Sequence, residues 1–205
     1  MRYPYIAFDI DGTLVDSEFS CIQSFRDTLE ELTGVVYTNE ELAFSQGIPG
    51  LDALKLMHLP DIPRAFQLWR ENQEKYRDTI TIFPGIPQLL EDLAQRGRIL
   101  GLVTSQTREE YEEGFAHLPI AHYFTIPIRA DDAPGHKPTP APLLKFMELA
   151  GCQPSEVLYI GDRESDLRCA RGAGVDFALA GWGNPTGQLH ADYRLEKPED
   201  LLRYL

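Results

Sequence analysis

Short apolar runs rich in β-branched and aromatic residues occur at the start of the chain and again throughout its second half. They are Tyr5–Phe8, Ile99–Thr104, Glu156–Gly161 and Val175–Leu179. Runs of this length, bounded by polar or glycine-containing segments, are typical of strands that are buried on both faces of a parallel sheet. Because helical segments separate them, the pattern predicts right-handed β-α-β crossovers and an α/β fold.

The helices of this α/β part carry recognisable start and stop signals. Ile86–Gln95 is followed by Gly97, which ends it, and Thr107–Glu110 has the sequence of a capping box. Thr139 is followed by Pro140, and this pair predicts a helix that is N-capped by the threonine and has proline at its first position. Strands and capped helices therefore alternate to the end of the chain.

A different pattern follows the first strand. From Ser17 to about Leu32, apolar residues recur with helical spacing, and Phe19 belongs to the predicted buried face. A longer helix is predicted to carry apolar side chains from Phe66 to Ile80, and no strand is predicted from 16 to 84. We therefore expect an α/β core of residues 1–15 and 85–205, interrupted by a helical insert of residues 16–84.

Composition narrows the functional classes. The 205 residues include 32 acidic and 19 basic ones, which gives a formal net charge of −13. Such a chain repels nucleic acid and anionic membranes, so neither is an expected partner.

No apolar run approaches the roughly 18 to 20 residues of a membrane span. The N-terminal segment reaches Asp9 too early for a signal peptide, and the three cysteines lack metal-ligand spacing, so we expect a reduced, cytoplasmic protein.

Polar residues that could take part in catalysis or ligand binding follow several of the predicted strands or precede a helix. They are Asp9, Asp11, Gly12 and Thr13; Thr104 and Ser105; His136 and Lys137; and Asp162 with Asp166. In an open parallel sheet, ligands bind beyond the carboxyl ends of the strands, so we expect these residues to converge in one crevice.

Each residue type has a chemical task in such a crevice. Clustered carboxylates stay ionised when a cation lies among them, and an all-oxygen set suits Mg²⁺ with a phosphate oxygen as a further ligand. Asp9 and Asp11 are two residues apart on an extended segment, so one can attack phosphorus while the other moves protons. Thr104 offers a hydroxyl and Ser105 a backbone N–H to phosphate oxygens, and Lys137 adds positive charge to the transition state.

These residues resemble the four motifs of the haloacid dehalogenase-like superfamily. Asp9–Ser17 resembles the first motif, Thr104 the second, Lys137-Pro138 the third and Gly161-Asp162 with Asp166 the fourth, in the order that the family requires. The resemblance spans the whole chain, and the insert is similar to the helical cap of the family's first type. It implies a Rossmann-like, doubly wound parallel sheet with a small helical cap inserted after the first strand.

The resemblance also implies roles for individual residues. Asp9 would form an aspartyl-phosphate, and Asp11 would protonate the leaving group and then activate water. Mg²⁺ would be held by Asp9, the Asp11 carbonyl and Asp162, with Asp166 in support. The phosphate and the rest of the substrate would be bound by segments around the strand ends and by a loop of the cap. These are Gly12, Thr13, Thr104, Ser105 and Lys137 in the core, and Gly47, Ile48 and Pro49 in the cap.

Three positions refine the comparison with the family. Asp11 is the second acid that dehalogenases lack, so its presence favours phosphoryl transfer. Cys21 stands where β-phosphoglucomutases carry a histidine, which disfavours a mutase. Arg163 stands where relatives usually have a small hydroxyl residue, and the sequence leaves its direction open, as it leaves open a role for His136. For Asp166, support of the cation and capping of a helix both remain possible.

We therefore predict a Mg²⁺-dependent phosphatase of a small phosphorylated metabolite, working as a monomer or homodimer. Phosphoglycolate is the first choice of substrate, with pyrophosphate or a sugar phosphate as alternatives. From a different class, a signalling module that is phosphorylated on aspartate without turnover remains an alternative. The phosphatase prediction requires the carboxyl groups of Asp9 and Asp162 to lie within about 8 Å, because ligands of a shared Mg²⁺ sit near 2.1 Å from it.

Overall fold

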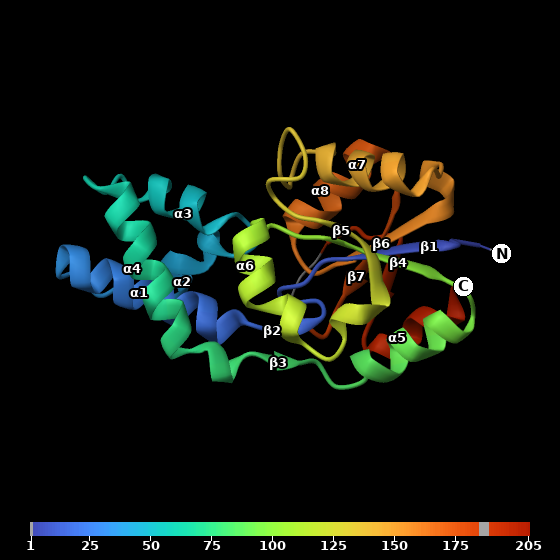
Figure 1. The fold of residues 1–205 in the computed structure, drawn as a ribbon, viewed down its shortest axis with the longest axis horizontal. Helices are drawn as coiled ribbons and strands as arrows, with labels where there is room; N and C mark the ends of the chain where they lie inside the picture. The colour runs from blue at the N-terminus through green and yellow to red at the C-terminus, as the bar shows by residue number, and fades with distance from the viewer. Residues whose placement is uncertain (1, 185–188) are drawn as a thin grey trace. The chain divides into compact units, whose positions relative to one another are not determined.

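The computed structural model describes residues 2–184 and 189–205 of the protein (Figure 1). The chain divides into two compact units. The first comprises Met1–Val15 and Ile82–Leu205, and the second is Asp16–Thr81. The second unit, which contains about one third of the chain, is thus inserted into the first unit soon after its first strand.

The first unit is built on a six-stranded sheet in which every neighbouring pair is parallel. Its strands, in spatial order, are β5 (Phe124–Ile128), β4 (Ile99–Val103), β1 (Tyr5–Phe8), β6 (Val157–Gly161), β7 (Asp176–Ala180) and β8 (Tyr193–Leu195). The chain adds strands on one side of β1 and then crosses to the other side. The reversal of direction at β1 makes this strand the topological switch point, where open α/β sheets bind ligands.

Helices cover both faces of this sheet. They are α5 (Ile86–Gln95), α6 (Arg108–Glu113), α7 (Ala141–Ala150) and α8 (Glu164–Ala173). Figure 1 shows α7 and α8 together on one face and α5 on the opposite face, where it contacts the C-terminal turn Pro198–Arg203. A doubly wound α/β fold is therefore confirmed.

The sheet core follows from the alternation of side chains along each strand. Ala7 and Tyr159 belong to the hydrophobic cluster that includes Phe146 of α7, whereas their neighbours Ile6 and Ile160 are buried outside that cluster. Every strand of the centre of the sheet is thus buried on both faces, which explains its continuous apolar sequence.

The second unit consists of four helices. They are α1 (Glu18–Thr33), α2 (Asn39–Leu42), α3 (Gly50–Leu56) and α4 (Ile62–Lys75). Its separate core is formed by Ile22, Phe25, Leu29, Leu42, Ala53, Leu54, Ala65 and Trp69. Gly50 opens α3 against the indole of Trp69, because a Cβ there would lie 2.0 Å from a ring carbon. The two chain crossings between the units, β2 (Val15–Asp16) and β3 (Thr81–Ile82), pair with each other.

Four strands were not predicted from the sequence. β5 and β8 are the edges of the sheet: Pro127 interrupts the strand pattern of β5, and β8 has only three residues. An edge position tolerates a proline because one side of the strand needs no hydrogen-bond donor. β2 and β3 have two residues each, too few for a periodic pattern.

Three details of the helices correct the sequence prediction. Phe19 is 59% exposed, because the core of the second unit begins one turn later, at Ile22. Helix α4 ends at Lys75, and a 3₁₀ turn separates it from Ile80.

The third correction concerns the start of α7. This helix begins at Ala141, and Pro140 rather than Thr139 occupies its N-cap. The Thr139 hydroxyl instead donates to the His136 carbonyl oxygen at 2.9 Å, within the loop that precedes the helix. The threonine therefore shapes this loop and does not cap the helix.

None of the helices in the described ranges combines the length and the apolar character that crossing a lipid bilayer requires.

Gly101 of β4 offers a test of the sheet packing. A Cβ at this position would lie 2.2 Å from a ring carbon of Phe146 and 2.7 Å from the Ile126 carbonyl oxygen. We expect Gly101→Ala to lower the free energy of unfolding by about 1–3 kcal/mol, the usual cost of overpacking a core. Ile99→Thr on the same strand, at a 40% exposed position, should cost less than about 0.5 kcal/mol. Urea denaturation measures both; equal stability of the two variants would contradict the packing.

Candidate active site

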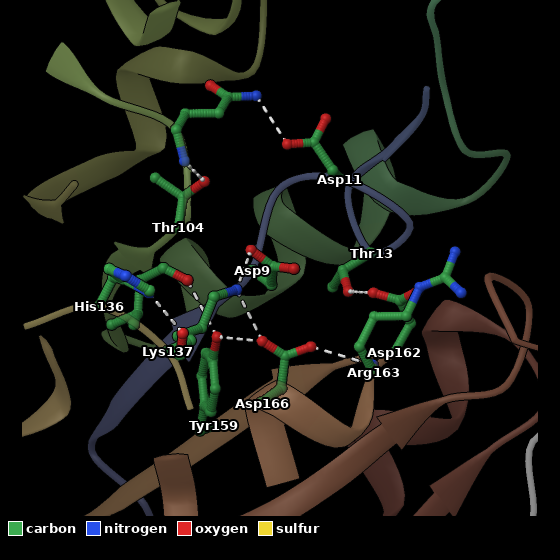
Figure 2. A network of polar contacts seen from close by, with 12 residues as sticks. Asp9, Asp11, Thr13, Thr104, His136, Lys137, Tyr159, Asp162, Arg163 and Asp166 are labelled. Carbon is green, nitrogen blue, oxygen red and sulfur yellow. Dashed lines mark hydrogen bonds and ion pairs between the residues drawn. The ribbon is translucent and has the colours of Figure 1, made fainter. Parts of the chain in front are cut away.

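The candidate site lies at the carboxyl ends of β1, β4 and β6, next to the switch point of the sheet. Asp9 follows β1 directly, Thr104 follows β4 and Asp162 follows β6. Lys137 comes from the loop between β5 and α7, and Asp166 lies in the first turn of α8. Because the strands are parallel and in register, segments far apart in sequence deliver these side chains to one place (Figure 2).

Lys137 is the centre of the polar network. Its Nζ lies 2.7 Å from Asp9 Oδ1 and 2.7 Å from Asp166 Oδ1, and all three side chains are almost completely buried. A buried ammonium group with two carboxylate neighbours keeps its charge and orders both of them. The Nδ1 of His136 lies 2.7 Å from the Lys137 carbonyl oxygen.

Asp166 connects the lysine to two further elements. Its Oδ1 also lies 2.9 Å from the hydroxyl of Tyr159, which is equally close to the Val103 carbonyl oxygen. Its Oδ2 accepts a hydrogen bond from the Arg163 backbone N–H at 3.0 Å, at the start of α8. The side chain therefore caps the helix and belongs to the carboxylate cluster at the same time.

Asp162 is contacted by two residues that follow the first strand and by its own neighbour Arg163. The Thr13 hydroxyl donates to its Oδ1 at 3.3 Å. Gly12 approaches so closely that a Cβ there would lie 2.4 Å from Asp162 Oδ2, and its φ of 80° also favours glycine. The Arg163 Nε lies 2.8 Å from the same Oδ2. Gly12 and Thr13 thus support Asp162 directly, a role that the sequence did not indicate.

Figure 2 shows Asp11 and Thr104 on the side of Asp9 away from Asp166. The two share a neighbour, Gln106. The Gln106 amide donates to Asp11 Oδ2 at 2.8 Å, and its backbone N–H donates to the Thr104 hydroxyl at 3.1 Å. A hydroxyl that accepts one hydrogen bond still has its own proton to donate. Thr104 is therefore able to donate a hydrogen bond to a phosphate oxygen.

Burial and charge set the protonation behaviour of the cluster. Burial raises the pKa of Asp9 well above its usual range, against the opposing effect of Lys137. Burial raises the pKa of Asp162 to about 7, and the neighbouring charge of Asp166 contributes in the same direction. Burial by itself would lower the pKa of Lys137, but Asp166 and Asp9 outweigh it and raise that pKa above its ordinary value. The raised pKa values of Asp9 and Asp162 mean that a positive charge added among these carboxyl groups, such as a proton or a cation, is favourable.

The donor set fits a hard divalent cation. One carboxylate oxygen from each of Asp9, Asp162 and Asp166 lies within 4.8 Å of the others, and all three residues are buried. The convergence expected of Asp9 and Asp162 is therefore confirmed. Among the described residues, no hydrogen bond reaches the buried Asp162 Oδ2. Closely spaced carboxylate oxygens are ligands that Mg²⁺ prefers, and within the part of the chain that the structure describes Asp162 Oδ2 is free of a competing hydrogen bond.

Comparison with known proteins agrees with this geometry. Residues 6–180 match the haloacid dehalogenase-like hydrolase family. The chain belongs to this family.

A curated relative from Bacillus velezensis, named pyrophosphatase PpaX, is 30% identical over 98% of this chain and 95% of its own length. A crystal structure from Lactobacillus plantarum, named "putative phosphoglycolate phosphatase", is 32% identical with a TM-score of 0.89 and covers 100% of both chains. A haloacid dehalogenase-like hydrolase from Streptococcus pneumoniae has a TM-score of 0.81 at 25% identity, over 98% of this chain and 97% of its own.

The remaining predicted site residues lie as follows. Ser105 follows Thr104 and is half-buried. Gly47, Ile48 and Pro49 belong to the second unit, where they precede α3, and Ile48 packs partly against the hydrophobic core of that unit. Part of what Ile48 does is therefore internal packing, and contact of this loop with substrate stays a prediction.

Sequence reasoning missed several residues that contact the candidate site. Tyr159 was assigned only to a buried strand and Gln106 to no role. The Trp182 indole N–H donates to the Thr13 carbonyl oxygen at 2.9 Å, and the Asn184 amide donates to the Asp162 carbonyl oxygen at 2.7 Å. The one local signal in the sequence was the glycine at position 183, next to Trp182. In the structure, a Cβ at Gly183 would lie 1.6 Å from the Gly12 carbonyl oxygen. Its close approach to Gly12 requires a residue without a side chain.

The role of Tyr159 is open to a direct test. Tyr159→Phe removes the hydroxyl that faces Val103 and Asp166, and a buried acceptor then loses its donor. We expect the free energy of unfolding to fall by about 1–2 kcal/mol in urea denaturation. Tyr123→Phe is the matched control: the tyrosine is half-buried, and its hydroxyl has no hydrogen-bond partner within the described residues. It should change stability by less than about 0.5 kcal/mol.

Proposed function

We propose that the protein is a Mg²⁺-dependent phosphatase that hydrolyses a small phosphomonoester through an aspartyl-phosphate on Asp9. The observation that carries the proposal is the buried cluster of Asp9, Asp162 and Asp166 around Lys137. Membership of a hydrolase family supports turnover, and so argues against a signalling module that only stores phosphate.

In the first step, a carboxylate oxygen of Asp9 attacks the phosphorus, and the bond from phosphorus to the leaving oxygen breaks. Lys137 binds Asp9 Oδ1 and so fixes the plane of the carboxylate. Asp11, whose carboxyl group is oriented by Gln106, enters the step protonated and gives its proton to the leaving oxygen. The leaving group departs with this oxygen protonated.

In the second step, Asp11 takes a proton from a water molecule, and the water oxygen attacks the phosphorus of the aspartyl-phosphate. The bond between Asp9 and phosphorus breaks, inorganic phosphate leaves and the Asp9 carboxylate is restored. The Thr104 hydroxyl and the backbone N–H of Ser105 donate to phosphate oxygens in both steps. The Lys137 charge stabilises the negative charge that develops on those oxygens.

A bound Mg²⁺, held by Asp9, the Asp11 carbonyl and Asp162, would neutralise phosphate charge and orient the ester for in-line attack. Asp166 would support it by ordering Lys137 and the start of α8. As part of the same proposal, the helical unit acts as a cap whose loop of Gly47, Ile48 and Pro49 contributes to the choice of leaving group. We propose that the enzyme is cytoplasmic.

Two substrates have specific support. The Lactobacillus plantarum structure is named for phosphoglycolate and the Bacillus velezensis relative for pyrophosphate. We retain 2-phosphoglycolate as the first choice and pyrophosphate as the second. Both are small anions in which a phosphoryl group is bonded to a leaving oxygen, so the two steps above apply to either.

The nucleophile is tested with a chromogenic aryl phosphate and MgCl₂. Asp9→Asn removes the attacking oxygen's charge, so we expect kcat to fall by at least roughly 10⁴-fold, as when the nucleophile of a covalent mechanism is lost. Asp16→Asn, an exposed acid of the same segment, should retain activity and serves as the control. Hydrolysis that survives Asp9→Asn at more than a few per cent would overturn the covalent mechanism.

The cation is tested by chelation. EDTA should abolish turnover of the wild type, and added MgCl₂ should restore it, because three clustered carboxylates repel a phosphate dianion unless a divalent cation offsets their charge. Unchanged activity in EDTA, measured after extensive dialysis, would contradict the proposed dependence on Mg²⁺.

The substrate is tested by kcat/KM on a panel of 2-phosphoglycolate, pyrophosphate and a sugar phosphate. We expect the largest kcat/KM for 2-phosphoglycolate. A higher value for pyrophosphate would replace the first choice by the second without changing the mechanism.

A further inference from the structure

Arg163 places a positive charge against the candidate cation site. It is the residue before α8, and its backbone is extended, with φ of −113° and ψ of 160°. The side chain turns back toward the preceding residue, so that Nε lies 2.8 Å from Asp162 Oδ2 (Figure 2). The Asp162 side chain is fully buried, whereas the Arg163 side chain remains 28% exposed.

The contact is an ion pair without hydrogen-bond geometry. Within the described residues, Asp162 Oδ2 receives no hydrogen bond, although Arg163 is close to it. On another side, the Gly12 main chain closes on the same oxygen. Gly12 cannot withdraw without moving the loop after β1. The guanidinium group can withdraw, because its side chain already reaches solvent.

The two basic residues of the cluster pair with different carboxylates. Lys137 contacts Asp9 and Asp166, and Arg163 contacts Asp162. Asp162 is therefore the carboxylate of the cluster whose neutralising partner is partly exposed. A divalent cation that binds Asp162 has to compete with this guanidinium for the same carboxylate.

We propose that Arg163 is a displaceable internal counter-ion of Asp162, which pairs with the carboxylate when no divalent cation is bound and leaves it when one binds. This inference rests on the cation site of the proposed function. Arg163 then has two opposite effects, one on the stability of the protein and one on its affinity for the cation. Arg163 stabilises the cation-free protein, because a buried carboxylate without a partner is costly. It also weakens cation binding, because the ion pair has to be broken first.

The first experiment compares Arg163→Gln with the wild type at pH 8, using MgCl₂ alone and no phosphate compound. Without Mg²⁺, Tm should fall by about 2–4 °C, the shift that corresponds to a weak charged contact in a chain of this size. The Mg²⁺ dissociation constant from calorimetric titration should become about threefold to tenfold smaller, in line with the loss of one competing charged contact.

The control is Arg168→Gln, which removes the same charge from an exposed position on α8, five residues further along the chain. It should leave both Tm and the Mg²⁺ dissociation constant unchanged. Equal effects of the two substitutions would show that net charge, and not the pairing with Asp162, sets the affinity. Unchanged or weaker Mg²⁺ binding in Arg163→Gln would likewise overturn the inference.

The displacement itself is followed by NMR of the arginine Nε–H groups, with the Arg163 signal assigned by its loss in Arg163→Gln. We expect the chemical shift and the solvent-exchange rate of this signal to change with the same midpoint as Mg²⁺ binding. A signal that stays constant while Mg²⁺ binds would place Arg163 on Asp162 in both states and overturn the inference.

The inference and the proposed function can fail separately. Turnover that depends on Asp9, together with unchanged Mg²⁺ affinity in Arg163→Gln, would refute the counter-ion and leave the phosphatase intact. A wild type that binds no Mg²⁺ would overturn the inference together with the cation's part in catalysis. The Asp9→Asn assay would then decide on the covalent mechanism by itself.

Discussion

The structure depends on placing one buried ammonium group between two buried carboxylates. Lys137 Nζ contacts Asp9 and Asp166 at 2.7 Å each, with all three side chains removed from water. Removing ions from water costs several kcal/mol each, and only close pairing offsets that cost. The sheet, the loop before α7 and the start of α8 therefore have to hold their positions together. The same contacts that stabilise this region orient the carboxylate that we propose as nucleophile.

Backbone packing makes room for this arrangement. Gly12 and Gly161 both lie against carboxylates, since a Cβ at Gly12 would meet Asp162 and one at Gly161 would lie 2.6 Å from Asp166. Glycine at these places lets main chain approach the acidic side chains without steric conflict. The close packing leaves the carboxylate oxygens few directions in which to find a partner. Oxygens confined in this way are suited to share a cation, and Arg163 occupies one of the remaining directions.

Much of the fold and of the candidate site could be predicted from the sequence, for reasons that are local. Continuous apolar runs indicate β1, β4, β6 and β7 because each is buried on both faces. The acids that follow β1 and β6 could be placed together because parallel strands end at the same edge. The edge strands β5 and β8 lack that pattern, since a proline or a short length is tolerated where one side of a strand is unpaired.

The sequence by itself determined the family, the α/β order of elements and the identity of the acids and lysine, because these depend on residue type and on spacing along the chain. The tertiary structure decided what surrounds them. Tyr159, Gln106 and Trp182 have no local signal for a role at the site, and Arg163 left two directions open. Their contacts cross from one strand end or loop to another, so their partners are fixed by how the chain folds back on itself. Pairing of charged and hydrogen-bonding groups in the buried site is a property of that three-dimensional neighbourhood, which no single stretch of sequence contains.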